Sequence, residues 1–207
     1  MRKADKALYL AKEKGKNRHI IYEERLHGKL ETDDMQNMAM AYAVSKEKKR
    51  EAITEMIVEL CVSGVNAIVK NEERLQQIRS LFDLDGITVF SDRGSNLVCR
   101  NGNYMAEVPD VRPGFEDEGY LALFGDDGIF VESNMIRLRS QNPAAYAVTQ
   151  EQEIGAALQC LSRKEGIPYT MVNFEVFNRN RKWSDEDVTL LTLLGHCIGN
   201  LLNYSEQ

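Results

Sequence analysis

Two long apolar runs near the C-terminus constrain the fold of this chain more than any other feature. They cover residues 156–161 and 169–177, and a charged segment ending in Gly166 separates them. Because side chains alternate between the two faces of a strand, we expect both runs to be strands. The turn residues between them favour an antiparallel pair. The second run then divides into one face with Val172, Phe174 and Val176 and another with Met171 and Phe177.

A helix start follows these runs. Ser184 is a predicted N-cap with Asp187 at the N3 position, an aspartate variant of the capping box. Trp183 and Val188 then occupy the positions of a hydrophobic staple. An apolar stripe continues through Leu191, Leu194, Ile198 and Leu201.

The preceding part of the chain reads as helices followed by short strands. Residues 24–45 are polar and predict a helical connector, and an apolar stripe over 46–69 predicts the strongest helix. A shorter helix is predicted over 71–82. Short strands are predicted at 87–90, 96–99 and 128–131, with an irregular stretch at 103–126. This order predicts an α+β domain over 46–207, with an antiparallel sheet and helices on one face.

The charge distribution narrows the classes of partner. Residues 1–30 carry nine Lys or Arg against four Asp or Glu, whereas residues 31–207 carry 17 against 28. An acidic main domain disfavours nucleic-acid binding, which needs a basic face. No apolar run reaches the ~18 residues of a membrane span. We therefore expect a cytoplasmic protein with no nucleic-acid partner and no membrane span in this segment.

The four cysteines, Cys61, Cys99, Cys160 and Cys197, are widely spaced. They form no pair with zinc-ligand spacing. We interpret them as reduced thiols, and we expect no metal, no cofactor and no catalytic residue in this chain.

Residues 4–18 read ADKALYLAKEKGKNR. This stretch resembles the closing segment of GGDEF diguanylate cyclase domains, which commonly reads A-D-x-A-L-Y-x-A-K-x-x-G-[RK]-N-[RQ]. The resemblance implies that Lys12 and Lys16 are the positions near the nucleotide phosphates. The GGDEF motif itself and its metal-binding carboxylates are absent, although cyclase chemistry needs carboxylate-bound Mg²⁺. We therefore expect residues 1–23 to be a C-terminal fragment of a GGDEF domain, and the chain to convert no GTP.

Residues 46–203 resemble a GAF domain of the kind fused to bacterial GGDEF proteins. The resemblance rests on the strand hairpin and on Arg181-Lys182-Trp183-Ser184-Asp185-Glu186-Asp187, followed by Leu190-Leu191 and Leu194-Gly195. It implies an antiparallel sheet of five or six strands, a ligand pocket on the face away from the helices, and frequent dimers through terminal helices.

We expect that pocket to bind an unknown small molecule. Its predicted lining residues are Cys99, Tyr104, Phe130, Arg137 and Tyr169, although each can equally be a core or surface residue without a ligand. The chain lacks the N-K-x-x-x-F-x-x-x-D-E pattern of cyclic-nucleotide GAF domains and any recognisable site for covalent bilin attachment. The leading hypothesis is a sensory or regulatory module of a cyclic di-GMP signalling protein, acting as a homodimer on an attached output domain. The alternatives are a thiol redox enzyme similar to free methionine sulfoxide reductases and a ligand-free dimerisation spacer.

Overall fold

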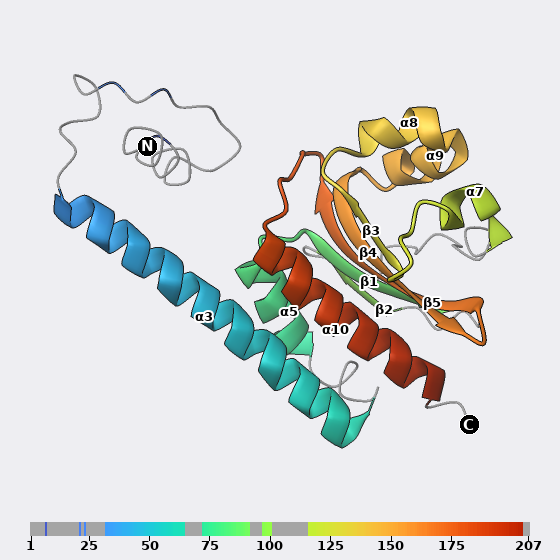
Figure 1. The fold of residues 1–207 in the computed structure, drawn as a ribbon, viewed down its shortest axis with the longest axis horizontal. Coiled ribbons are helices and arrows are strands. Elements are labelled where there is room, and N and C mark those ends of the chain that lie inside the picture. Colours follow the sequence, from blue (N-terminus) through green and yellow to red (C-terminus); the bar gives the residue numbers. More distant parts are fainter. Residues whose placement is uncertain are drawn as a thin grey trace. The chain divides into compact units, whose positions relative to one another are not determined.

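Figure 1 shows the computed structural model of the 207-residue chain. The structure describes residues 7, 21, 23, 32–64, 72–91, 97–100 and 116–204. The chain divides into two compact units, Met1–Lys48 and Lys49–Gln207, and the predicted GAF-like domain covers almost the same residues as the second. Lys12 and Lys16 lie outside the described residues, so the assignment of 1–23 to a cyclase fragment stays a prediction.

The sheet has five strands in the order β2-β1-β5-β4-β3, and every neighbouring pair is antiparallel. The strands are β1 (Gly86–Ser91), β2 (Leu97–Arg100), β3 (Ile129–Glu132), β4 (Ile154–Lys164) and β5 (Ile167–Phe177). The two apolar runs therefore form an antiparallel pair, β4 and β5, as predicted. The α+β fold class and the antiparallel sheet are confirmed.

Each face of the sheet carries its own apolar cluster. Val172, Phe174 and Val176 of β5 face the cluster that also holds residues of the long helices, whereas Met171 and Phe177 join the opposite cluster. The predicted division of this strand is thus confirmed. We call the two sides the helix face and the opposite face.

Three helices contribute to the helix face: α3 (Thr32–Ser63), α5 (Glu72–Leu81) and α10 (Asp185–Tyr204). Of α3, it is the part after Lys49 that packs there, through Ile53, Met56 and Leu60. Arg74 of α5 forms ion pairs with Glu55 and Glu59 of α3. These contacts make α5, α10 and the part of α3 after Lys49 one layer over the sheet.

Helix α3 differs from the prediction at both ends. It begins at Thr32, inside the predicted connector, and it ends at Ser63 rather than at residue 69. Gly64 follows with a φ of +62°, and its N–H donates to the carbonyl of Leu60 over 2.8 Å. A glycine accepts this left-handed conformation without a steric penalty and so ends the helix.

Short helices lie on the opposite face, in addition to the predicted helix layer (Figure 1). They are α7 (Glu118–Leu121), η1 (Met135–Arg137), α8 (Leu138–Gln141) and α9 (Pro143–Glu151). Asn142 caps α9 by accepting a hydrogen bond from the N–H of Ala145, and Pro143 follows at the first turn. The segment 132–150, for which the sequence pattern predicts no clear structure, is therefore mostly helical.

Helix α10 packs closely on β4 because it carries two glycines on its inner side. A Cβ at Gly195 would lie 2.6 Å from Sγ of Cys160, and one at Gly199 would lie 2.2 Å from Oγ of Ser162. Ser184 caps the helix as predicted, because its Oγ accepts a hydrogen bond from the N–H of Asp187 over 3.1 Å. No helix among the described residues is both long and apolar enough to cross a membrane.

Candidate functional site

Buried polar side chains line the middle of the opposite face. Thr88 of β1 lies directly across from Asn173 of β5, which lies directly across from Gln159 of β4. These three residues, here called the polar row, are at most 5% exposed. Burying polar groups is costly unless they find partners, so a row of three in the sheet centre needs an explanation.

Glu175 lies next to the polar row, two residues after Asn173 on the same face of β5. Its side chain is only 1% exposed, and its Oε1 accepts a hydrogen bond from Oγ1 of Thr88 over 2.8 Å. A carboxyl group is among the costliest groups to bury. The polar row therefore continues into an acidic group that also faces away from the long helices.

Tyr120 of α7 reaches the row from above the sheet. Its hydroxyl donates to Oε1 of Gln159 over 2.7 Å and lies 3.6 Å from Sδ of Met171. Burial raises the pKa of the Tyr120 hydroxyl, and the nearby Glu175 raises it further. The phenol therefore stays protonated at neutral pH and acts as a hydrogen-bond donor.

Helix α7 holds Tyr120 in this place by a local cap. Asp117 accepts a hydrogen bond from the N–H of Tyr120 and another from the side-chain amide of Asn142. The hydrogen bond from the N–H of Tyr120 is the largest cause of the lowered pKa of the Asp117 carboxyl, which lies at the protein surface. Asp117 thus links the start of α7 to the start of α9.

Asn173 supplies the clearest sign of an incomplete site. Its Oδ1 is buried and accepts no hydrogen bond in the part of the chain that the structure describes. A buried acceptor without a partner costs about 1 to 3 kcal/mol. A ligand that donates a hydrogen bond to this oxygen would remove that cost.

Aromatic side chains stand beside the polar row. Phe130 of β3 lies directly across from Gln159, and its ring centroid is 5.8 Å from that of Phe124. Phe124 in turn meets the ring of Tyr120 edge to face, at a centroid distance of 5.5 Å. Apolar walls with a few polar groups are the usual composition of a small-molecule site.

The predicted lining residues are distributed unevenly. Phe130 lies on the opposite face as expected, Tyr169 is buried on β5, and Arg137 is exposed on η1. No hydrogen bond or ring contact joins these three side chains. Cys99 lies on β2 across from Ile87, but its side chain is outside the described part, as is all of Tyr104. The assignment of these five residues to a pocket stays a prediction.

The polar row itself was not predicted from the sequence. Two strongly apolar strands are interrupted by polar residues: Gln159 in β4, and Asn173 and Glu175 in β5. Each lies between two neighbours in the sequence that point to the helix face. A polar residue within a strand that is otherwise buried on both sides is the signal that would have indicated them.

Two observations concern metal ligands and the buried thiol of Cys160. No group of three or more His, Cys, Asp or Glu side chains among them is arranged to hold a metal ion. Cys160 is buried on the helix face, and burial raises the pKa of its thiol to about 12. Because the thiolate is the reactive form, burial disfavours reaction of this cysteine at neutral pH.

The fold is that of photosensory domains of known structure. A far-red-absorbing protein with bound biliverdin, JSC1_58120g3, aligns with a TM-score of 0.55 and 14% identity over 75% of this chain and 99% of its own. The chromophore-binding domain of the Stigmatella aurantiaca bacteriophytochrome aligns with a TM-score of 0.55 and 15% identity over 75% of this chain. That of RpBphP3 from R. palustris aligns with a TM-score of 0.57 and 12% identity over the same share.

This chain spans about three fifths of the two bacteriophytochrome domains, 60% and 61% of their lengths. No protein-family profile and no curated protein matches the chain. The structural neighbours are GAF domains of phytochromes and cyanobacteriochromes. At this level of identity they establish the fold, so the chain has a GAF fold.

Proposed function

We propose that the GAF-fold part of the chain is a sensory module that binds a small organic molecule on the opposite face of the sheet, at the polar row. The observation that carries this proposal is the buried Oδ1 of Asn173, which lies among Thr88, Gln159 and Glu175 without a donor. The ligand would donate hydrogen bonds to this acceptor-rich floor and place its apolar part beside Phe130. The biliverdin held by one structural neighbour is consistent with a ligand of this general kind.

The sensory role is proposed to serve a longer cyclic di-GMP signalling protein in the cytoplasm. The support is the resemblance of residues 4–18 to the end of a GGDEF domain. The chain itself lacks the motif for cyclase chemistry, so we propose that it regulates and does not catalyse. Ligand binding would act by favouring one arrangement of the helices that lead to the output domain.

A homodimer through the helices is part of the same proposal. Val58 and Val62 of α3 and Leu193 of α10 are more than half exposed, at 55%, 81% and 54%. Exposed apolar side chains on the helices of a domain are typical of a surface that a second copy covers. Val58→Glu and Leu193→Glu would then shift the protein from dimer to monomer in light-scattering measurements. Ile136→Glu, at an apolar residue of η1 that is also 55% exposed but lies on the opposite face, would not.

The ligand proposal is tested by native mass spectrometry of the purified protein, followed by a thermal-shift screen that includes biliverdin. A ligand at one hundred times its Kd stabilises the folded state by about 2.7 kcal/mol. We expect Asn173→Ala and Thr88→Val to weaken its binding by about tenfold or more. Thr189→Val, which removes an exposed hydroxyl, is the matched control and should bind as the wild type does.

Two results would contradict the ligand proposal. Equal binding to the wild type and to Asn173→Ala would place the ligand elsewhere. Failure of every compound to bind would favour the ligand-free dimerisation spacer.

A further inference from the structure

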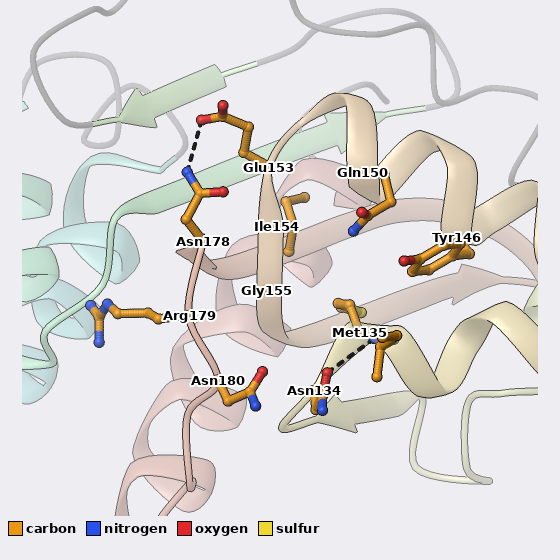
Figure 2. A pocket seen from close by; sticks show the side chains of 11 residues that line it. Asn134, Met135, Tyr146, Gln150, Glu153, Ile154, Gly155, Asn178, Arg179 and Asn180 are labelled. Atoms are coloured by element: carbon orange, nitrogen blue, oxygen red, sulfur yellow. Dashed lines mark hydrogen bonds between the residues drawn. The ribbon is translucent and has the colours of Figure 1, made fainter. Parts of the chain in front are cut away.

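A hollow of about 400 Å³ opens where β4 begins and β5 ends (Figure 2). Polar side chains from three segments surround it: Asn134 before η1, then Tyr146, Gln150 and Glu153 in the segment from α9 to the start of β4, and Asn178 and Asn180 after β5. Met135 and Ile154 are buried apolar residues that also line it. Its volume lies at the lower end of the range for small-molecule sites, which begins at about 300 Å³.

Most of the polar groups around the hollow have hydrogen-bonding capacity left. Asn134 uses its oxygen to accept from the N–H of Ile136, which leaves its amide NH₂ group. Asn178 uses its NH₂ group to donate to Glu153, which leaves its oxygen. The side chains of Gln150 and Asn180 and the hydroxyl of Tyr146 make no hydrogen bond within the described residues. Carboxamides and hydroxyls offer donors and acceptors side by side.

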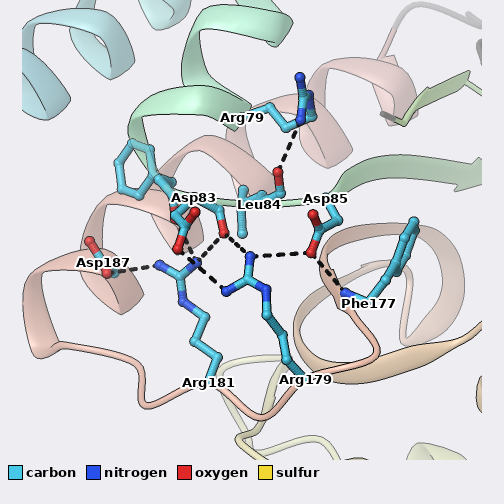
Figure 3. Close-up of polar contacts among 9 residues, drawn as sticks. Arg79, Asp83, Leu84, Asp85, Phe177, Arg179, Arg181 and Asp187 are labelled. Carbon is cyan, nitrogen blue, oxygen red and sulfur yellow. Dashed lines mark hydrogen bonds and ion pairs between the residues drawn. The ribbon is translucent and has the colours of Figure 1, made fainter. Parts of the chain in front are cut away.

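The positive charge at the hollow is already compensated by two carboxylates. The guanidinium of Arg179 points away from it and forms ion pairs with Asp83 and Asp85, at 3.3 and 3.2 Å (Figure 3). The carboxylate of Glu153 accepts from Asn178 over 3.1 Å. An anionic ligand would therefore find no free positive charge and would be repelled by the carboxylate of Glu153, which favours a ligand without negative charge.

The walls of the hollow are held in place before any ligand binds. Gly155 lies at a shift of the β4–β5 register, and a Cβ there would come within 2.4 Å of the carbonyl oxygen of Arg179. Glu153 and Asn178 both adopt positive φ angles, 58° and 53°, and the N–H of Asn178 donates to the carbonyl of Glu153 over 2.8 Å. A preformed site loses less conformational entropy on binding.

We propose that this hollow is a second ligand site, for an uncharged, hydroxyl-rich small molecule of the size of a monosaccharide or disaccharide. Each ligand hydroxyl both donates and accepts, as do the amide groups of Asn134, Gln150 and Asn180. The apolar C–H face of a sugar ring matches the side chain of Ile136, which also lines the hollow and is 55% exposed. The site is separate from the polar row, so this proposal does not depend on the proposed function.

The test is a titration of the ¹⁵N-labelled chain with D-glucose and with sucrose, followed by NMR. We expect one of these sugars to shift the backbone signals of residues 153–155 and 178–180 and the side-chain amide signals of Gln150 and Asn180. The double variant Gln150→Ala/Asn180→Ala should weaken that binding by about tenfold or more. Both side chains are exposed and unbonded, so the variant keeps the fold, which its melting temperature checks.

Asn200→Ala is the matched control, because Asn200 is an exposed amide residue on α10. It should bind the sugar as the wild type does. The proposal is overturned if neither sugar shifts these signals up to its solubility limit, or if the double variant binds as tightly as the wild type. It is also overturned if only adenosine or glucose 6-phosphate, the comparison ligands, shifts them. The sugar titration is independent of the polar row. Its outcomes would be the same if Asn173→Ala no longer bound a ligand there.

Discussion

Nζ of Lys49 on α3 donates to Oδ1 of Asp187 on α10 across 2.6 Å. The other oxygen of the same carboxylate accepts from Arg181 across 3.0 Å (Figure 3). Arg181 also donates to the carbonyls of Phe82 and Asp83. One carboxylate therefore joins α3, the turn after α5, and the loop that leads from β5 into α10.

Replacing this carboxylate should destabilise the domain. Asp187→Asn leaves the ammonium of Lys49 and the guanidinium of Arg181 without their shared negative partner, and both side chains are less than 20% exposed, at 18% and 10%. We expect a loss of about 2 to 4 kcal/mol in the free energy of unfolding, measured by urea denaturation. Asp185→Asn, on the exposed side of the same helix turn, should cost less than about 0.5 kcal/mol. Equal losses for the two variants would show that the effect comes from the helix start and not from the ion pairs.

The close packing of α10 on β4 predicts an unusual response to alanine. At an exposed helix position, Gly→Ala stabilises by about 1 kcal/mol. At Gly199 the new methyl group would meet Oγ and Cβ of Ser162, at 2.2 and 3.0 Å, so we expect Gly199→Ala to destabilise by about 1 to 3 kcal/mol. The measurement is thermal or urea unfolding.

A second substitution should partly rescue this variant. Ser162→Ala removes the Oγ atom, which is buried without a hydrogen-bond partner in the described structure. In a double-mutant cycle, Gly199→Ala should therefore cost less in the Ser162→Ala background than in the wild type. Additive effects would mean that α10 moves away from the sheet and that the close contact does not determine stability.

The strands and their faces could be predicted because they depend on local periodicity. Met171 and Val172 are neighbours in the sequence and fall into different apolar clusters, as alternation along a strand requires. The cap at Ser184 is equally local, because its partner is the N–H three residues later.

The site could not be predicted in the same way, because it depends on strand register. Thr88 and Gln159 are far apart in the sequence and reach the same row only because each pairs with Asn173. Asp187 shows the same limit. The sequence pattern assigns its carboxylate to the capping box, whereas the fold brings Lys49 of α3 to it from a distant segment, beside the nearby Arg181. Such long-range partners carry no signature in the local pattern.

Tyr120 allows the polar row to be tested without a ligand. Tyr120→Phe removes the hydroxyl that donates to Gln159 over 2.7 Å and leaves that buried amide oxygen without this donor. We expect a loss of about 1 to 2 kcal/mol in the free energy of unfolding. Tyr146→Phe is the matched control, since the Tyr146 hydroxyl makes no hydrogen bond within the described residues. Equal stability of Tyr120→Phe and the wild type would show that water replaces the lost hydroxyl and that the face is open to solvent.

The buried thiol of Cys160 predicts how stability changes at alkaline pH. Burial raises its pKa to about 12 from an ordinary value of 9.0, with a smaller contribution from Asp127. The pKa is higher in the folded state, so the thiol binds its proton more tightly there. Its contribution to stability is therefore constant below about pH 8 and falls as the unfolded-state thiol ionises. Between about pH 8 and about pH 10, the wild type should lose about 1.4 kcal/mol more than Cys160→Ala, in which this group is absent.

The measurement is urea unfolding of both proteins over this pH range, with a reductant to prevent thiol oxidation. Thr189→Val is the control, since it removes an exposed hydroxyl that does not titrate in this range and should leave the pH dependence of the wild type unchanged. Parallel curves for the wild type and Cys160→Ala would mean that the Cys160 thiol ionises as readily in the folded state as in the unfolded chain. A thiolate accessible in that way would restore Cys160 as a candidate for redox chemistry.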